Sequence, residues 1–156
     1  MTLKPVPVSD AAFARFGRVV LTPRGTPTSE AKDYKFWSDI AHYEIQGETE
    51  IGLCQVFRQP VNSITGMERH LRTPEILIPI DAPFVLPLLL EGNPSGEAGI
   101  FRVEPGQAVV INPGVWHGAC LPVGADASWY FVVFRRGTPT TDVEKKPVES
   151  FTIEGA

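Results

Sequence analysis

The chain has 156 residues, the length of one ordinary domain and enough to bury a complete hydrophobic core. Its 14 basic and 18 acidic residues give a net charge of −4 and form no basic stripe, which argues against a nucleic-acid-binding protein. The 14 glycines and 15 prolines are many for a helical bundle, whereas 43% hydrophobic residues are too many for a disordered chain. We therefore expect a single, mainly β domain over residues 1–156.

The first predicted element is a short helix over residues 9–17. Ser9 is a favourable N-cap, Asp10 suits the positive end of the helix, and Gly17 can end it. After a short apolar run at residues 19–21, the chain is rich in Pro, Gly, Thr and Ser up to Ser29 and has no apolar period. This stretch predicts a loop.

From Tyr34 onward, short β-like runs alternate with turn residues, which is the spacing of a sandwich or small barrel. The predicted strands are residues 41–45, 51–57, 64–69, 75–79, 84–90, 99–103, 108–111, 118–121 and 129–134. The polar tail after Gly137 is expected to lie on the sheet through the apolar anchors Val143, Val148, Phe151 and Ile153.

Cysteine usage and targeting signals indicate a cytoplasmic protein. Cys54 and Cys120 both lie in apolar strand-like runs, where a small buried thiol is the common outcome and a disulfide or reactive thiol the alternative. The N-terminal segment lacks the apolar stretch of a signal peptide. The longest apolar run, residues 82–90, contains two prolines and is far shorter than a membrane span. We expect no membrane partner.

Two of the three histidines lie in segments that differ from ordinary core strands. On a strand, Glu68 and His70 share one face because they are two residues apart, and Glu75 returns in the next predicted strand. His117 follows a strand and the tight turn at residues 112–114. If these segments meet, two imidazoles and one or two carboxylates form a metal site with open positions, which suits Zn, Mn, Fe, Co or Ni.

These segments resemble the paired motifs of the cupin superfamily, H-x-H followed by Glu, and G-x5-P-x-G-x2-H. The first reads Glu68-x-His70, with Glu75 after four further residues, and the second covers residues 106–117. Glu68 stands where the superfamily usually has its first histidine, and Asn112 where it has proline. The resemblance implies a cupin-type β-barrel, also called a double-stranded β-helix, with a short N-terminal helix.

The wider pattern is similar to one branch of that superfamily, the ureidoglycolate lyase family. The strings that carry this similarity are FARFG at residues 13–17, MERH at 67–70, GVWH at 114–117 and FVVFRRG at 131–137. The resemblance implies a homodimeric carbon–nitrogen lyase that splits ureidoglycolate into glyoxylate and urea in allantoin (purine) catabolism. It also implies a divalent metal as cofactor.

The resemblance and the residue types together select the candidate site. Glu68, His70 and His117 are the candidate catalytic residues, and with Glu75 they are the candidate metal ligands. A metal so held can chelate an α-hydroxy carboxylate and make its hydroxyl proton easier to remove. As the C–N bond breaks, Glu68 or Glu75 can relay that proton to the leaving urea nitrogen.

A cation is needed to orient the substrate carboxylate. The candidate substrate-binding residues are Lys35, Arg58, Arg69 and Arg135, together with Trp116 as a wall of the pocket.

Several positions depart from the family pattern and leave two alternatives open. The family usually has Gln where Glu75 stands and a second His where Gly118 stands, and its Arg-aromatic-His-Asp string is interrupted here by Lys35 and Ser38. One alternative is a cupin isomerase, epimerase or lyase that acts on a sugar or sugar acid. The other is a non-catalytic, small-molecule-binding cupin.

Overall fold

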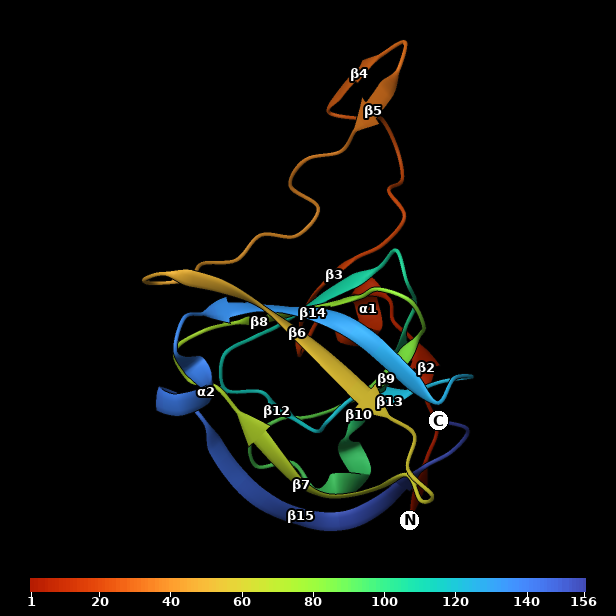
Figure 1. Ribbon diagram of the computed structural model, residues 1–156, viewed down its shortest axis with the longest axis vertical. Coiled ribbons are helices and arrows are strands. Elements are labelled where there is room, and N and C mark those ends of the chain that lie inside the picture. The colour runs from red at the N-terminus through yellow and green to blue at the C-terminus, as the bar shows by residue number, and fades with distance from the viewer.

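The computed structural model describes residues 1–156, and strands dominate it (Figure 1). The strands are β1 (Thr2–Leu3), β2 (Val6–Pro7), β3 (Gly17–Val20), β4 (Ser29–Ala31), β5 (Tyr34–Phe36), β6 (Thr49–Phe57), β7 (Ser63–Arg69), β8 (Glu75–Pro79), β9 (Phe84–Leu89), β10 (Gly99–Val103), β11 (Ala108–Ile111), β12 (Trp116–His117), β13 (Leu121–Pro122), β14 (Ala127–Arg135) and β15 (Glu144–Ile153). Helical structure is limited to α1 (Asp10–Phe13), α2 (Thr138–Thr141) and a 3₁₀ turn at Ser95–Glu97. Both α-helices have only four residues, and neither could span a bilayer.

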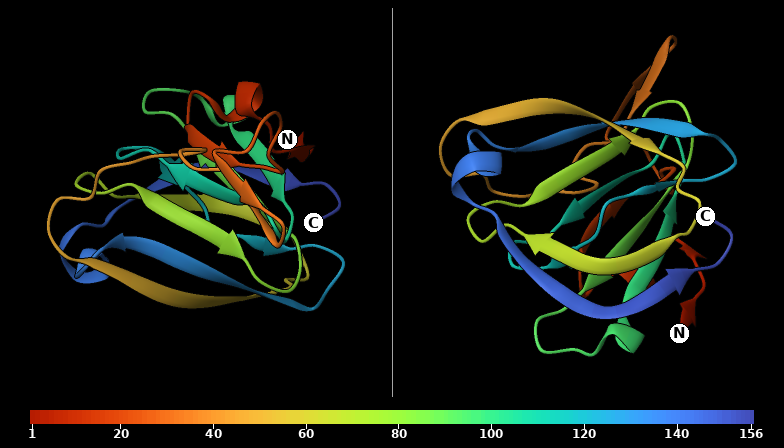
Figure 2. Two further views of the ribbon diagram at one scale, coloured as in Figure 1. Left: turned by 90° about the horizontal axis from the view of Figure 1, so that it is seen from above. Right: turned by 60° about the horizontal axis from the view of Figure 1, so that its bottom comes forward.

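Two curled sheets form a barrel-like shell, which confirms the predicted mainly β fold. The larger sheet has the strand order β1-β15-β7-β12-β9-β10-β2, with β13 paired to β9, and the smaller has the order β3-β11-β8-β14-β6. β4 and β5 form a separate hairpin at the tip of an arm that projects away from the shell (Figure 1). The parallel pairing of β1 with β15 brings the N- and C-terminal segments side by side (Figure 2).

Alternation along the strands places the core between the sheets. In β14, Ser128, Tyr130, Val132 and Phe134 are buried while the residues between them are less so, as expected for a strand with one face inward. A cluster of 17 buried residues fills the space between the sheets, and a second cluster of nine lies against the larger sheet. Each fully buried Leu or Phe contributes about 1.5–3 kcal/mol, so these clusters fix the positions of the strands that carry polar groups.

The predicted helix begins as expected but is shorter. The Ser9 hydroxyl accepts a hydrogen bond from the Ala12 amide at 3.2 Å, which confirms the N-cap. The helix ends at Phe13, and Gly17 opens β3 instead of ending the helix. A Cβ at Gly17 would lie 1.7 Å from the Val110 carbonyl oxygen, so the close approach of β3 to β11 requires glycine there.

Two predicted strands are wrong, and in each case pairing explains the difference. Residues 41–45 have no partner strand because they lead back from the arm to the shell. Residues 118–121 are not one strand, since His117 faces Leu88 and Leu121 faces Val85 on β9. Four steps along one strand therefore match three along the other, and the pairing is interrupted between β12 and β13.

The other predicted strands and the tail agree with the structure. The predicted runs at 75–79, 99–103 and 108–111 coincide with β8, β10 and β11. The tail forms β15, which pairs with β7 and buries the predicted anchors Phe151 and Ile153. Cys54 and Cys120 are both free, and Cys120 is buried.

Candidate active site

Strand register places three polar side chains next to one another in the larger sheet. Glu68 on β7 faces His117 on β12 and, on its other side, Lys145 on β15. Directly opposed residues project to the same face of a sheet, and here that face lines the interior of the shell. The Lys145 Nζ lies 3.9 Å from the Glu68 carboxylate.

His70 is held by two contacts from distant parts of the chain. Its carbonyl oxygen accepts the Gly114 amide at 2.7 Å, which ties the end of β7 to the turn that precedes His117. Its Nδ1 donates to the Asp142 carbonyl at 2.7 Å. The Asp142 carboxylate in turn accepts the amides of Leu71 and Arg72, both at 2.9 Å. Because Nδ1 donates to the Asp142 carbonyl, the other ring nitrogen, Nε2, is directed toward the interior.

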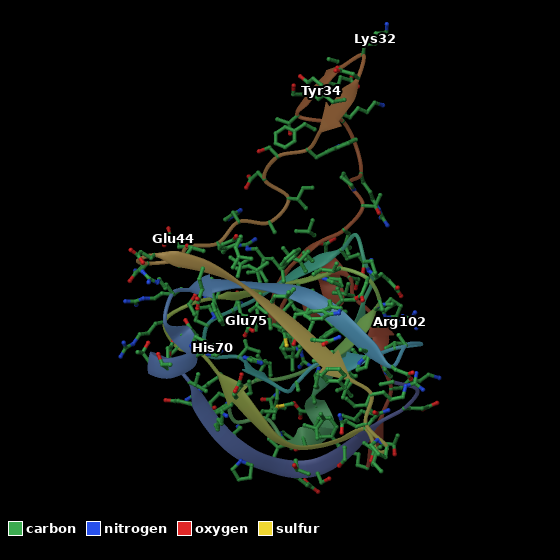
Figure 3. The ribbon with its side chains drawn as sticks, viewed as in Figure 1. Lys32, Tyr34, Glu44, His70, Glu75 and Arg102 are labelled. Carbon is green, nitrogen blue, oxygen red and sulfur yellow. The ribbon has the colours of Figure 1, made fainter.

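Glu75 comes from the opposite sheet and completes the cluster. It begins β8, and its Oε2 lies 3.1 Å from Nε2 of His70 and 3.0 Å from Nε2 of His117. Figure 3 shows Glu75 and His70 pointing into the space between the sheets. All three side chains are buried, whereas Glu68 is 39% exposed. The sequence-predicted ligands Glu68, His70, Glu75 and His117 therefore meet in one place.

The electrostatics of the cluster favour an ionised Glu75. Burial alone would raise its pKa, but the charge and hydrogen-bonding capacity of His117 and His70 outweigh burial and lower the pKa to about 2. Burial alone would lower the pKa of His70, but its contacts with Glu75 and with the Asp142 carbonyl, together with the charge of Glu68, raise that pKa instead. The cluster is thus a carboxylate shared by two imidazoles.

The donor set fits a divalent metal. One ligand atom from each of Glu68, His70 and His117 lies within 4.8 Å of the others. Glu75 Oε2 and His117 Nε2 are fully enclosed and, although close, do not align as a hydrogen bond. Buried polar atoms without hydrogen-bond partners are costly, and a cation between them would satisfy both. Nitrogen and carboxylate ligands of this kind suit Zn, Mn, Fe, Co or Ni.

Two cavities open on the cluster from different sides. The His117 cavity, of about 440 Å³, has apolar walls that include Val56, Leu77 and Tyr130. The His70 cavity, of about 650 Å³, extends under α2. Both are lined by Glu68, Glu75 and Lys145. A small acid entering either cavity would therefore meet the carboxylates, an imidazole and an ammonium group.

Gly118 and Cys120 shape the His117 cavity but do not supply reactive groups. A Cβ at Gly118 would lie 2.8 Å from Cγ of Pro87, so the ring of Pro87 occupies the space that a side chain at this position needs. Burial raises the pKa of Cys120 far above its ordinary value, which keeps the thiol neutral and poorly nucleophilic. Burial likewise raises the pKa of Tyr130.

The candidate substrate-binding residues do not line either cavity. Arg69 and Trp116 neighbour Glu68 and His117 in sequence and therefore project to the opposite face of the sheet. There the Arg69 guanidinium contacts Glu91 and Glu144 at 2.9 and 2.7 Å and lies 4.4 Å from the Trp116 ring centre.

The other three candidates lie further away. Lys35 is on the exposed β4–β5 hairpin, 3.9 Å from Glu30, and Arg58 pairs with Asp126 at 3.7 Å. Arg135 ends β14 and lines a separate hollow on the outside of the shell.

Sequence reasoning missed two residues that lie at the cluster. Asp142 holds His70 from 72 positions away, and Lys145 stands beside Glu68. The only sequence feature that could have identified Lys145 is the alternation of inward and outward side chains along the tail strand. That feature can be used only once β15 is known to pair with β7. No local pattern marks Asp142.

The family model and the curated relatives both point to one family. A family model described as ureidoglycolate lyase matches residues 1–154. Ureidoglycolate lyase 2 of Rhizobium meliloti (strain 1021) is 29% identical over 147 residues, covering 89% of this chain and 88% of that protein. Ureidoglycolate lyase of Burkholderia mallei (strain NCTC 10229) is 29% identical over 144 residues, covering 87% and 84%. Among solved structures, a deletion mutant of Bacillus subtilis oxalate decarboxylase superposes with a TM-score of 0.45 and 15% identity, over 57% of this chain and 22% of that one.

Proposed function

Because the chain belongs to the ureidoglycolate lyase family, we propose that it splits ureidoglycolate into glyoxylate and urea at the cluster of Glu68, His70, Glu75 and His117. The observation that carries this proposal is the convergence of both imidazoles on one Glu75 oxygen, at 3.1 and 3.0 Å. The family model and the curated relatives are named ureidoglycolate lyase and give no support to the sugar-directed and non-catalytic alternatives.

The reaction moves one proton and breaks one bond. Ureidoglycolate carries a carboxylate, a hydroxyl and a ureido nitrogen on a single carbon. Loss of the hydroxyl proton lets the oxygen form a carbonyl while the C–N bond breaks, and the departing nitrogen takes up a proton to give urea. No water is consumed. One group that accepts a proton from oxygen and returns it to nitrogen is therefore sufficient.

Glu68 is the carboxylate best placed for this proton relay. It is 39% exposed, so it can reach the substrate, whereas Glu75 is buried between two imidazoles and its pKa of about 2 makes it a poor base. Glu75 instead orients His70 and His117, since its Oε2 lies 3.1 and 3.0 Å from their Nε2 atoms. The imidazole Nε2 atoms polarise the substrate hydroxyl and increase its acidity.

Glu68, His70 and His117 would hold a divalent cation, and Glu75 lies close enough to contribute a fourth ligand. Bound there, the cation would supply Lewis acidity toward the substrate hydroxyl. The enclosed, unaligned atoms of Glu75 and His117 support this part of the proposal.

Lys145 is proposed to bind the substrate carboxylate. It lines both cavities, and its ammonium group lies 3.9 Å from Glu68. An ion pair there would place the hydroxyl-bearing carbon beside Glu68 and the imidazoles, which fixes the orientation that the proton relay requires.

The deciding experiment is an assay of purified protein for urea and glyoxylate. The protein is tested as isolated, after chelation, and after addition of each divalent ion, with elemental analysis of each sample. Equal amounts of both products in at least one metal condition support the proposal. No product in any of these conditions excludes ureidoglycolate as the substrate.

We further propose a cytoplasmic homodimer, formed through the outer face of β6 and β14. Leu53 and Phe131 are direct partners on these strands and are 59% and 41% exposed, and nearby Ile51 is 73% exposed. A contiguous apolar surface of this kind is typical of an interface. Light scattering should give twice the chain mass, and Leu53→Glu should give the monomer. Val61→Glu, at an exposed apolar loop residue, serves as the matched control.

A further inference from the structure

An arginine hollow lies outside the shell, at the base of the projecting arm. Its volume is about 760 Å³, and Arg18, Arg72 and Arg135 line it. It shares no lining residue with the His117 or His70 cavity. Figure 3 shows Glu44, which also lines the hollow, at the outer edge of the molecule, whereas His70 and Glu75 lie inside the shell.

The backbones of the three arginines are fixed by different parts of the fold. Arg18 lies on β3 in register with Val110. The Arg72 amide donates to the Asp142 carboxylate at 2.9 Å, and the Arg135 amide donates to the Thr73 hydroxyl at 3.0 Å. Three separate segments thus bring three arginines to the wall of one hollow.

None of these guanidinium groups forms an ion pair in the structure. The other arginines that contact carboxylates, such as Arg58 and Arg69, have partners within 4.0 Å, but Arg18, Arg72 and Arg135 have none. Arg135 is half-buried, and its guanidinium lies near Gly47, where an added Cβ would be 3.4 Å from Nε of Arg135.

The charge of the hollow contrasts with that of the whole chain. Three arginines face a single acidic residue, Glu44, in a protein whose net charge is −4. Asn112 and Tyr43 add neutral hydrogen-bonding groups to the same wall. Guanidinium groups bind carboxylate and phosphate oxygens in pairs, so an excess of two positive charges fits a ligand with at least two negative charges.

We propose that the arginine hollow binds a small polyanion that carries two or more carboxylate or phosphate groups. The site is separate from the cluster of Glu68, His70, Glu75 and His117, and it does not depend on the reaction catalysed there. The volume of about 760 Å³ leaves room for the rest of such a ligand beside its carboxylate or phosphate groups.

The test is calorimetric titration of the full chain, freed of metal because the probes bind metals, with citrate and pyrophosphate as probes. Acetate serves as the singly charged comparison. Each of Arg18→Gln, Arg72→Gln and Arg135→Gln is expected to raise the dissociation constant by about tenfold or more. Arg58→Gln, whose side chain pairs with Asp126 outside the hollow, is expected to leave it within about twofold.

Each outcome supports or overturns the proposal. Binding of citrate alone identifies a carboxylate ligand, and binding of pyrophosphate alone a phosphate ligand. Binding must survive in His117→Ala, since a loss there would place the anion in the reaction site and overturn the inference. Absence of binding by both probes, equal binding in the arginine variants, or a change in molar mass on substituting the arginines would also overturn it. The last result would assign the arginines to contact with a second copy.

Discussion

The reaction cluster and the arginine hollow gather charged side chains in opposite ways. In the cluster, His70 is bonded on both its ring and its backbone, and Glu75 lies within 3.1 Å of two imidazoles. In the hollow, the backbones are fixed but the guanidinium groups have no acidic partner. The cluster is therefore organised before any ligand arrives, whereas the hollow takes its final arrangement from its ligand. Substitutions should affect folding and catalysis in the first and anion affinity alone in the second.

The largest expected effect comes from the cluster. His117→Ala removes one of the two imidazoles and leaves Glu75 with His70 alone, so we expect kcat to fall by about 10³-fold or more. Bound metal measured by elemental analysis should fall with it. Far-ultraviolet circular dichroism checks that the variant is folded. If a folded His117→Ala variant keeps more than about a tenth of the activity, the reaction takes place elsewhere.

The sequence predicts features whose residues lie close together along the chain, but it does not predict contacts between residues that are far apart along the chain. The strands of the shell were predictable because runs such as 75–79 and 108–111 are bounded by turn residues. The meeting of His70 with His117 was implied by the resemblance to the paired cupin motifs. The support for His70 was not predictable, since Asp142 acts across 72 positions. Arg135 shows the same limit. Its residue type suggested anion binding, but only the course of β14 shows that it faces the arginine hollow.

The second prediction tests whether Glu75 is part of a preorganised ion cluster. Its pKa in the folded protein, about 2, lies below the ordinary value of 4.5. A lowered carboxylate pKa stabilises the fold above the ordinary pKa, and this stabilisation is lost as the pH falls toward the folded value. The full effect is about 3 kcal/mol, of which about 2 kcal/mol is lost by about pH 3.

Urea denaturation of metal-free protein between about pH 6 and about pH 3 measures this loss. The free energy of unfolding of the wild type should fall more steeply than that of Glu75→Gln, which keeps the shape of the side chain but cannot ionise. Other carboxylates contribute equally to both proteins and cancel in the comparison. Parallel curves would show that the Glu75 carboxylate is not stabilised by His70 and His117.

The third prediction concerns the support of His70. Asp142→Ala removes the acceptor of the Leu71 and Arg72 amides and loosens the segment whose carbonyl fixes His70 Nδ1. Removing a group that orients a metal-binding histidine through its second nitrogen typically lowers metal affinity or activity by about 10- to 100-fold. We expect such a decrease in metal affinity, measured by competition with a chelator. Asp126→Ala, at an exposed carboxylate that pairs with Arg58, is the control and should retain full affinity.

The smallest expected effect concerns the cation that binds the substrate carboxylate. The sequence suggested Lys35 for this role, whereas the structure favours Lys145. Lys145 lines both cavities beside Glu68, whereas Lys35 lies on the projecting hairpin beside Glu30. Lys145→Gln removes a charge that binds the substrate carboxylate in ground state and transition state alike, so KM should rise by about tenfold with little change in kcat. Lys35→Gln should leave both constants unchanged, as steady-state kinetics with ureidoglycolate will measure. A tenfold rise in KM for Lys35→Gln but not Lys145→Gln would mean that the arm, and not the tail strand, supplies the cation that holds the substrate.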